Sequence, residues 1–173
     1  NCEIVYQKYQ GFGAALIQGI SETQTRYFCI FNADGSFDPS ELNGMLNEIK
    51  NFNHDFIFAS RYQKNSGSDD DTLVTSVGNF IFTKIGNIFF QLSITDILYT
   101  YVLGKTDCAK KLNLFQKDFR FCVELPIKAK RMKMRLFSSS AYERKRIAGK
   151  KKVNAFKDGL LILSHMIYLF FKR

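Results

Sequence analysis

In the first sixty residues, segments whose apolar residues are arranged as in strands alternate with segments whose apolar residues have helical spacing. Residues 3–9, 27–31 and 55–59 have strand character, and the apolar run at 27–31 is continuous, as in a buried strand. Residues 12–23 and 40–51 carry apolar positions at helical spacing. The order β-α-β-α-β predicts an α/β fold with a mostly parallel sheet, right-handed crossovers and flanking helices.

The next segments mix long helices with polar connections. Residues 63–71 are rich in Gly, Ser and Asp and predict a mobile loop, and 93–106 predict a connecting stretch. Residues 121–131 predict a helix and 134–138 a strand. Residues 73–92 predict a long helix with a wide apolar face, made of Val77, Phe80, Ile81, Ile85, Ile88, Phe89 and Leu92.

The C-terminal segment is distinguished from the rest of the chain by its apolar and aromatic residues, which follow the basic run. We expect a main domain over 1–153 and an amphipathic or interfacial helix over 154–173. The apolar run at 160–171 is shorter than the ~20 residues that cross a bilayer. Since Lys157 precedes it and Lys172 follows it, the helix either lies in the plane of a membrane interface or packs as a core helix.

Composition narrows the class of protein. The chain has 173 residues, 46% of them apolar and 15% aromatic, which suits one domain with a real core and excludes general disorder. The four cysteines form no CxxC pair and predict reduced thiols of a cytoplasmic protein. The chain shows no signal peptide and opens at Asn1 almost directly into a strand-like run, so we expect a longer parent chain.

The positive charge is concentrated in one segment. The net charge is +9, and twelve Lys and Arg lie between Lys128 and Lys157 against a single acid, Glu143. Such a segment predicts a local anionic partner. The basic run at 143–152 leads into the aromatic C-terminal segment, which favours a membrane surface over a duplex. A non-catalytic basic module that binds anionic lipid or nucleic acid is the alternative.

The clearest candidate for chemistry is the sequence Asn-Ala-Asp-Gly at 32–35, directly after a predicted buried strand. In open α/β sheets, ligands bind outside the carboxyl ends of the strands. The Asp34 carboxylate at that position can hold Mg²⁺ or Mn²⁺, and the metal can neutralise a diphosphate. The alternative is equally strong: Asp34 belongs to a plain turn, and Asp38 caps the next helix before Pro39.

Two further polar residues stand out by their positions. Arg61 follows the third predicted strand, where its guanidinium can bind a phosphate with two hydrogen bonds. Asp96 is isolated in the apolar stretch 92–101, so it is either paired or functional. His54 and His165 have no companions at ligand spacing and receive no role.

Taken in order, the motifs resemble family-2 glycosyltransferases, specifically the polyprenyl-phosphate branch, which is similar to dolichol-phosphate mannosyltransferase. The resemblance extends from Ile4 to about Leu163. It rests on GFGAAL at 11–16, NADGSFDP at 32–39, ASRY at 59–62, SVGN at 76–79, TD at 95–96, ERKRIAGKKKVN at 143–154 and DG at 158–159.

The resemblance implies a GT-A fold that here lacks its first β-α-β segment, with C-terminal interfacial helices. It implies a hexosyltransferase that uses Mg²⁺ or Mn²⁺ and moves a sugar from a nucleotide-sugar donor to a polyprenyl (dolichyl-type) phosphate by in-line displacement. The expected location is the cytoplasmic face of a membrane, in a peripheral or interfacial position. No nucleic-acid partner is expected.

The resemblance also assigns roles to residues. Asp34 is the metal ligand, while Asn32 replaces the first acid of the family's Asp-x-Asp motif, so a pseudo-enzyme is a further alternative. The expected catalytic residues are Asp34, Arg61 and Asp96, with Arg61 facing the phosphates and Asp96 near the acceptor. The expected donor-binding residues are Gly11, Gly13, Asn32, Asp34 and Arg61. Those expected to bind the acceptor phosphate are Ser76, Arg144, Arg146 and Lys150.

Overall fold

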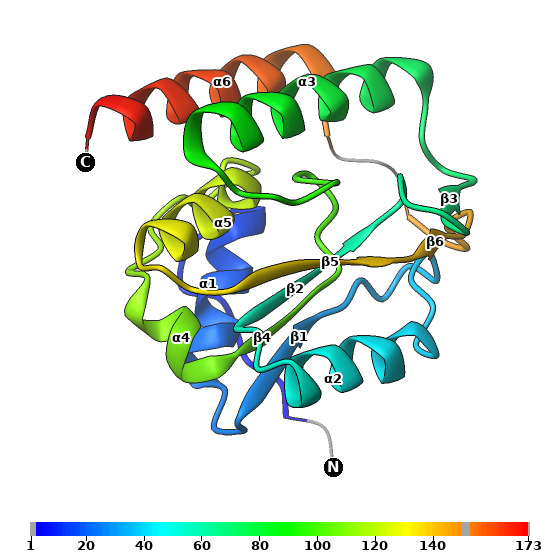
Figure 1. Ribbon diagram of the computed structural model, residues 1–173, viewed down its shortest axis with the longest axis vertical. Coiled ribbons are helices and arrows are strands. Elements are labelled where there is room, and N and C mark those ends of the chain that lie inside the picture. The colour runs from blue at the N-terminus through cyan, green and yellow to red at the C-terminus, as the bar shows by residue number, and fades with distance from the viewer. Residues whose placement is uncertain (1–2, 150–152, 173) are drawn as a thin grey trace.

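A four-stranded sheet forms the centre of the protein, whose computed structural model describes residues 3–149 and 153–172 (Figure 1). The strand order is β1-β4-β2-β5, with β1 at Tyr27–Ile30, β2 at Phe56–Ser60, β4 at Val102–Lys105 and β5 at Leu136–Ser140. β2 pairs with β5 in parallel, whereas β4 is antiparallel to both β1 and β2. β1, β2 and β5 thus run one way and β4 runs against them. The predicted α/β class is confirmed, in the form of a mixed sheet.

The reversed strand β4 is the feature that the sequence pattern missed. Residues 93–106 are predicted as a connection, but Val102–Lys105 inserts between β1 and β2. Therefore β1 and β2 are parallel without being neighbours. The strand has only four residues and contains Gly104, so it gives little periodic signal. The following short helix α4, Thr106–Lys111, was also absent from the prediction.

The strand predicted at 3–9 is wrong. These residues are exposed and carry no strand assignment. A strand is stabilised by ladder hydrogen bonds to a neighbour, and in the described part of the chain no strand lies beside this segment. Val5 and Tyr6 have strand propensity, but propensity without a partner does not make a strand.

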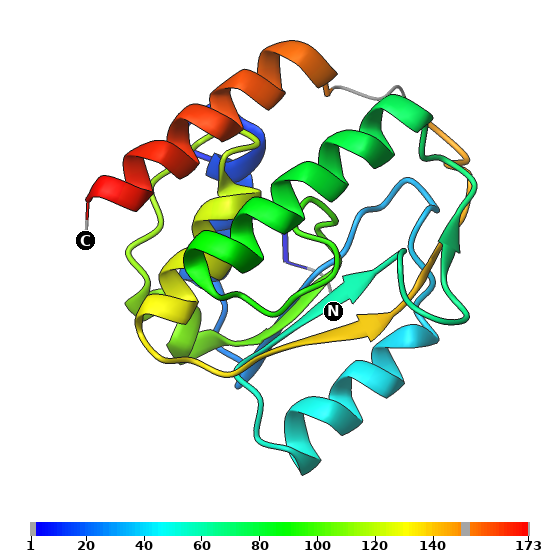
Figure 2. The same ribbon diagram turned by 45° about the horizontal axis from the view of Figure 1, so that its top comes forward.

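The helices cover both faces of the sheet and one end of the molecule. α1 (Phe12–Glu22), α4 and α5 (Phe121–Arg131) share one hydrophobic cluster with the sheet, and α2 (Glu41–Asn51) packs on the opposite face. α3 (Leu73–Phe90) and α6 (Ala155–Phe171) lie side by side along the top of the molecule in Figure 1, and the tilted view in Figure 2 shows the same pairing. The predicted helices are therefore confirmed, with ends shifted by one or two residues.

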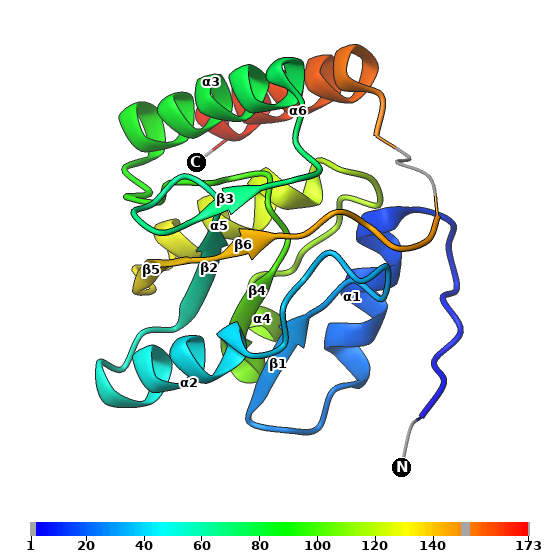
Figure 3. The same cartoon turned by 90° about the vertical axis from the view of Figure 1, so that its right-hand side faces the viewer.

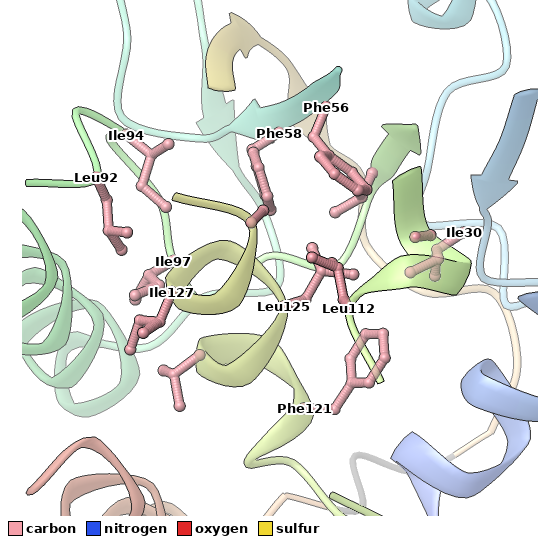
Figure 4. Packing of buried hydrophobic residues seen from close by; sticks show 14 of the residues in the cluster. Ile30, Phe56, Phe58, Leu92, Ile94, Ile97, Leu112, Phe121, Leu125 and Ile127 are labelled. Atoms are coloured by element: carbon pink, nitrogen blue, oxygen red, sulfur yellow. The ribbon is translucent and has the colours of Figure 1, made fainter. Parts of the chain in front are cut away.

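β2 is buried on both faces, as expected for a central strand. Phe56 and Phe58 point into the cluster with α5 (Figure 4), whereas Ile57 and Ala59 pack with Met45 of α2. This alternation follows from the two-residue period of a strand. It holds the carboxyl end of β2, and the Arg61 that follows it, in a fixed position.

Gly104 of β4 lets the rings of two neighbouring strands close over it. A Cβ at this position would lie 2.6 Å from Phe28 Cε1 and 2.7 Å from Phe56 Cδ1. We expect Gly104→Ala to lower the free energy of unfolding by about 1–3 kcal/mol, because neither ring can move without disturbing the core. Urea unfolding tests this, with Gly44→Ala in α2 as the control, since a Cβ there meets no atom within 4 Å. Equal effects at the two glycines would contradict the packing argument.

A short two-stranded ribbon sits at the right-hand edge of the molecule in Figure 1 and faces the viewer in Figure 3. β3 (Gly67–Ser68) pairs in parallel with β6 (Tyr142–Glu143). The Ser68 hydroxyl donates to Glu143 Oε2 at 2.5 Å, and Asp69 N–H donates to the Glu143 carbonyl at 2.8 Å. The segment 63–71, predicted as a mobile loop, is therefore tied to β6. Its polar composition correctly excludes a core position, but its side chains form hydrogen bonds within the protein.

Candidate active site

The carboxyl ends of β1 and β2 open into one cavity. Its volume is about 840 Å³. β1 leads into the turn at 32–38 and β2 leads into Arg61, so the parallel direction of these two strands brings both segments to the same end of the sheet. The polar residues that line the cavity include Gln7, Asn32, Asp34, Arg61, Asp70, Thr100, Glu143 and Arg146.

Asp34 presents one carboxylate oxygen to this cavity. Its Oδ1 accepts hydrogen bonds from Ser36 N–H at 3.0 Å and from the Ser36 hydroxyl at 2.7 Å. Its Oδ2 lies 3.7 Å from Arg146 NH1. Burial alone would raise the pKa of the Asp34 carboxyl, but the two hydrogen bonds and the Arg146 charge outweigh it and lower the pKa below its usual range. Asp34 is therefore an anion at neutral pH.

The basic loop at 143–149 covers the turn that carries Asp34. Arg144 N–H donates to the Ser36 carbonyl at 2.9 Å, and Ile147 N–H donates to the Asp34 carbonyl at 2.8 Å. Gly35 has a φ of +84°, and a Cβ there would meet the Ile147 side chain at 2.6 Å. The turn at 32–38, which holds the candidate metal ligand, and the basic loop at 143–149, which holds candidate ligands of the acceptor phosphate, are therefore bonded to each other. They are more than a hundred residues apart in the sequence.

Two arginines of this loop pair with acids around the cavity. Arg146 NH2 lies 2.8 Å from Asp70 Oδ2, so Arg146 bridges Asp70 and Asp34. Arg144 NH2 lies 3.2 Å from Asp38 Oδ2, and Arg144 is exposed outside the cavity lining. Of the two, only Arg146 lines the cavity. Lys150, the third predicted cation, lies outside the described residues.

Arg61 is the centre of a buried charge network. Its Nε donates to Asp96 Oδ2 at 2.8 Å, its NH2 donates to Asp96 Oδ1 at 3.1 Å, and its NH1 donates to Glu143 Oε2 at 3.1 Å. Burial would lower the pKa of the guanidinium, but Asp96 and Glu143 together raise it. Arg61 lines the cavity, yet each of its side-chain nitrogens already donates a hydrogen bond to an acid of the protein.

Asp96 is fully buried and does not line the cavity. Besides the Arg61 side chain, it accepts hydrogen bonds from the backbone N–H groups of Arg61 and Tyr99. The sequence left open whether this acid is paired or functional, and the structure shows it paired. Its proximity to an acceptor stays a prediction.

Of the remaining residues predicted for the site, one lines the cavity and two lie outside its lining. Gly11 lines the cavity, but Gly13 does not. A Cβ at either glycine would collide with a backbone carbonyl, of Lys117 or of Gln116, so both have a packing reason to be glycine. Ser76 lies half-buried in the first turn of α3, beside the Tyr62 hydroxyl. Their predicted ligand roles remain predictions.

Glu143 and Asp70 are cavity residues that the sequence analysis did not select. Glu143 is 8% exposed and accepts from both Arg61 and Ser68. One signal pointed to it: a lone acid inside a run of twelve cations requires a partner. Asp70 gave no such signal, because it belongs to a polar segment with three consecutive Asp residues.

The arrangement of strand-end carboxylate, mixed sheet and flanking helices is that of a GT-A fold. Residues 1–112 match the sequence profile described as Glycosyl transferase family 2. The chain belongs to this family of glycosyltransferases.

Solved structures agree with the fold. The chain is similar to glucosyl-3-phosphoglycerate synthase from Mycobacterium tuberculosis, in complex with Mn²⁺, UDP and glucosyl-3-phosphoglycerate, with a TM-score of 0.71 and 10% identity over 93% of this chain and 55% of that one. A second structure of the synthase, with Mn²⁺, UDP-glucose and glycerol 3-phosphate, has a TM-score of 0.64 and 9% identity over 93% of this chain and 55% of that one. The chain thus spans about half the length of these relatives, and the likeness establishes the fold.

Proposed function

We propose that the protein is a hexosyltransferase that moves a sugar from a nucleotide-sugar donor to a polyprenyl phosphate at the cytoplasmic face of a membrane. The observation that carries the proposal is the exposed apolar surface of α3 and α6, since α3 begins beside Arg61, which lines the cavity that holds Asp34. Membership of the family supports the donor class. The M. tuberculosis synthase is solved with UDP-glucose and glycerol 3-phosphate, which supports an acceptor that carries a phosphate group here.

The residues around Asp34 fit a divalent cation. Mg²⁺ and Mn²⁺ prefer oxygen ligands, and such ions are often held by one or two carboxylates together with substrate phosphates. Asp34 supplies an anionic oxygen and Asn32 lines the same cavity with a neutral one. In the described residues no group of three or more His, Cys, Asp and Glu could hold a metal, so the donor's diphosphate would complete the site. The bound ion would supply neutralisation of the leaving diphosphate.

The electrostatics of the cavity favour an acceptor that needs no general base. A phosphate monoester has a second pKa near ~6 and is ionised at neutral pH. Its oxygen can bond to the anomeric carbon of the sugar while the bond from that carbon to the nucleoside diphosphate breaks. Asp96 and Glu143 are both paired with Arg61, so neither is poised to accept a proton from a sugar hydroxyl. Arg146, at the cavity wall, can position the acceptor phosphate.

The polar side of α3 faces the protein and its apolar side faces outward, the reverse of an ordinary surface helix. Asn79 accepts from Leu98 N–H at 3.0 Å, and Thr83 accepts from Ile97 N–H at 3.2 Å. On the other side, Phe80 is 62% exposed and Ile88 is 68% exposed. This arrangement supports a helix that lies along a membrane surface with its polar side held by the protein.

α6 continues the same apolar surface. Leu160 is 70% exposed, whereas Ile162 and Met166 are buried in the core cluster. The helix therefore serves as a core helix on one side and has an unburied apolar side on the other. α3 is, within the described ranges, long and apolar enough to cross a bilayer by length and composition, and 17% of its 18 residues are buried. Its hydrogen bonds to 97–98 favour the interfacial position.

Phe80→Glu tests this membrane surface. We expect the variant to bind phosphatidylcholine vesicles about tenfold more weakly or worse, because a Phe side chain contributes roughly 1.5–3 kcal/mol on burial. Transfer to polyprenyl phosphate in vesicles should fall in parallel, with transfer to a short, water-soluble polyprenyl phosphate unchanged. Phe52→Glu is the matched control, since Phe52 is also 62% exposed but follows α2 at the other end of the molecule. If both variants bind vesicles like the wild type, α3 does not contact the membrane.

A further inference from the structure

We infer a second lipid site, separate from the sugar-transfer cavity, that takes the phosphate headgroup of an anionic phospholipid. It is a cavity of about 1150 Å³ at the carboxyl ends of α3 and α6. Its lining includes Phe89, Phe90 and Phe170 together with Lys130, Lys133 and Arg135. The inference rests on the membrane-surface part of the proposed function and on no part of its chemistry.

The site lies far from Asp34. The amino end of α3 begins beside the Arg61 network, where Asp71 lies 3.7 Å from Arg61. The carboxyl end of the helix reaches the second cavity at Phe89 and Phe90. With a rise of 1.5 Å per residue, the helix separates the two by roughly 25 Å. A lipid phosphate in the second cavity is therefore too far away to accept a sugar.

Two lysines of this cavity, Lys130 and Lys133, form no ion pair with a carboxylate of the described residues. This contrasts with Arg144 and Arg146, which are both paired with acids. The third cation, Arg135, lies beside the Asp55 carboxylate: its backbone N–H donates to Asp55 Oδ2 at 2.8 Å, and its charge acts on the same group. Two lysines without a carboxylate partner among the described residues, together with the partly compensated Arg135, favour an anionic ligand at this opening.

Arg131 fixes the wall of the cavity. Its NH1 donates to the Lys172 carbonyl at 2.8 Å, and its NH2 donates to the Leu169 carbonyl at the end of α6. These bonds hold the end of α5 against the end of α6, and the Arg131 guanidinium lies over the Phe90 ring at 5.9 Å. The positions of the neighbouring cations relative to the apolar surface are thereby set.

An apolar groove runs from this cavity between α3 and α6. The groove has a volume of about 210 Å³ and is lined by apolar side chains, including Ile85, Leu163 and Ile167. It shares Phe89, Phe90, Phe170 and Phe171 with the cationic cavity, so the two are continuous. A cationic end joined to an apolar groove matches an amphiphile with an anionic head and an acyl chain. A nucleic acid or a soluble phosphate would leave the groove unfilled.

The test compares vesicles of phosphatidylcholine with vesicles that also contain phosphatidylserine. We expect the anionic lipid to raise the vesicle affinity of the whole protein by tenfold or more, since each cation near a membrane surface adds about 1 kcal/mol. The triple variant K130Q/K133Q/R135Q should lose this increase and keep its binding to phosphatidylcholine. The control K50Q/K111Q/R26Q removes the same charge from exposed positions on α2, on α4 and before β1, and should keep the increase.

Three outcomes would overturn the inference. The first is loss of the increase in both variants, which would show an effect of net charge alone. The second is retention of the increase in K130Q/K133Q/R135Q. The third is displacement from anionic vesicles by duplex DNA at matched salt in the wild type but not in this variant, which would make the cavity a nucleic-acid site.

A parallel assay separates this inference from the proposed function. Transfer to polyprenyl phosphate is measured in micelles of a neutral detergent, where K130Q/K133Q/R135Q should transfer as the wild type does. If that variant alone loses transfer, the cavity binds the acceptor and the inference is wrong. If no protein transfers sugar but the anionic-lipid increase is lost in that variant, the proposed function fails and the lipid site stands.

Discussion

Replacing Asp34 with alanine is expected to reduce sugar transfer by a factor of about 10² or more, with the fold retained. Asp34 is the carboxylate of the 32–35 turn that faces the cavity, and its loss removes the anionic oxygen available to the metal. The measurement is kcat/KM for the nucleotide sugar at saturating Mn²⁺, together with the melting temperature.

Asp38→Ala is the control for this variant. Asp38 belongs to the same turn segment but pairs with Arg144 and does not line the cavity, so it should keep most of the activity. Asn32→Asp should also be tolerated, because it adds a second carboxylate to the 32–35 turn. Transfer by Asp34→Ala within a few-fold of wild type would remove Asp34 from the mechanism.

Replacing Arg61 with methionine is expected to lower the free energy of unfolding by about 3–5 kcal/mol. The variant keeps most of the side-chain volume but leaves Asp96 and Glu143 buried without their cation, and these acids are 0% and 8% exposed. Activity should fall with stability, since the network joins the segments after β2 and around β6. Denaturant unfolding measures the effect.

Arg120→Met provides the comparison for Arg61. Arg120 also pairs with an acid, Asp118 at 2.7 Å, but the side chains of this pair are 31% and 36% exposed. An exposed pair contributes at most about 1 kcal/mol, so this variant should unfold almost like the wild type. Similar losses for the two arginines would contradict the view that the buried Arg61 network holds the site together.

Local patterns predicted most of the fold because its helices and buried strands carry strong periodic signals. The helix at Leu73–Phe90 and the buried strand at Phe56–Ser60 were both expected from spacing alone. β4 could not be predicted in this way, since four residues with a glycine have little period and their pairing is set by distant partners. The N-terminal segment at 3–9 is the opposite case: its residues have strand propensity, but no strand of the described residues pairs with it.

The position of the site was predictable from the sequence, but its internal pairing was not. Asp34 and Arg61 both follow strands, and the rule for strand ends brings them to one cavity. Arg61 finds Asp96 and Glu143 at sequence separations of 35 and 82 residues, which no local pattern records. The sequence therefore predicted that Arg61 binds a phosphate, whereas the structure shows Arg61 at the centre of an ion-pair network within the protein.

The sequence showed a wide apolar stripe on α3, but it did not show that this stripe faces outward. Such a stripe normally faces the core. Here the buried positions are Asn79, Thr83 and Gly86, because the backbone at 97–98 requires hydrogen-bond acceptors from the helix. Only the packed structure shows that most of the stripe, Val77, Phe80, Ile81, Ile88 and Phe89, is exposed, whereas Leu92 is buried and Ile85 packs against the core.

The most direct test of the proposed function is the choice of acceptor. The protein is supplied with a panel of labelled nucleotide sugars, Mn²⁺ or Mg²⁺, and either polyprenyl phosphate in vesicles or 3-phosphoglycerate in solution. We expect label to appear in the lipid fraction as a sugar–phosphate–polyprenol, only when a divalent cation is present, and not on 3-phosphoglycerate. Label on 3-phosphoglycerate with none on the lipid, or no transfer from any nucleotide sugar, would contradict a polyprenyl-phosphate glycosyltransferase.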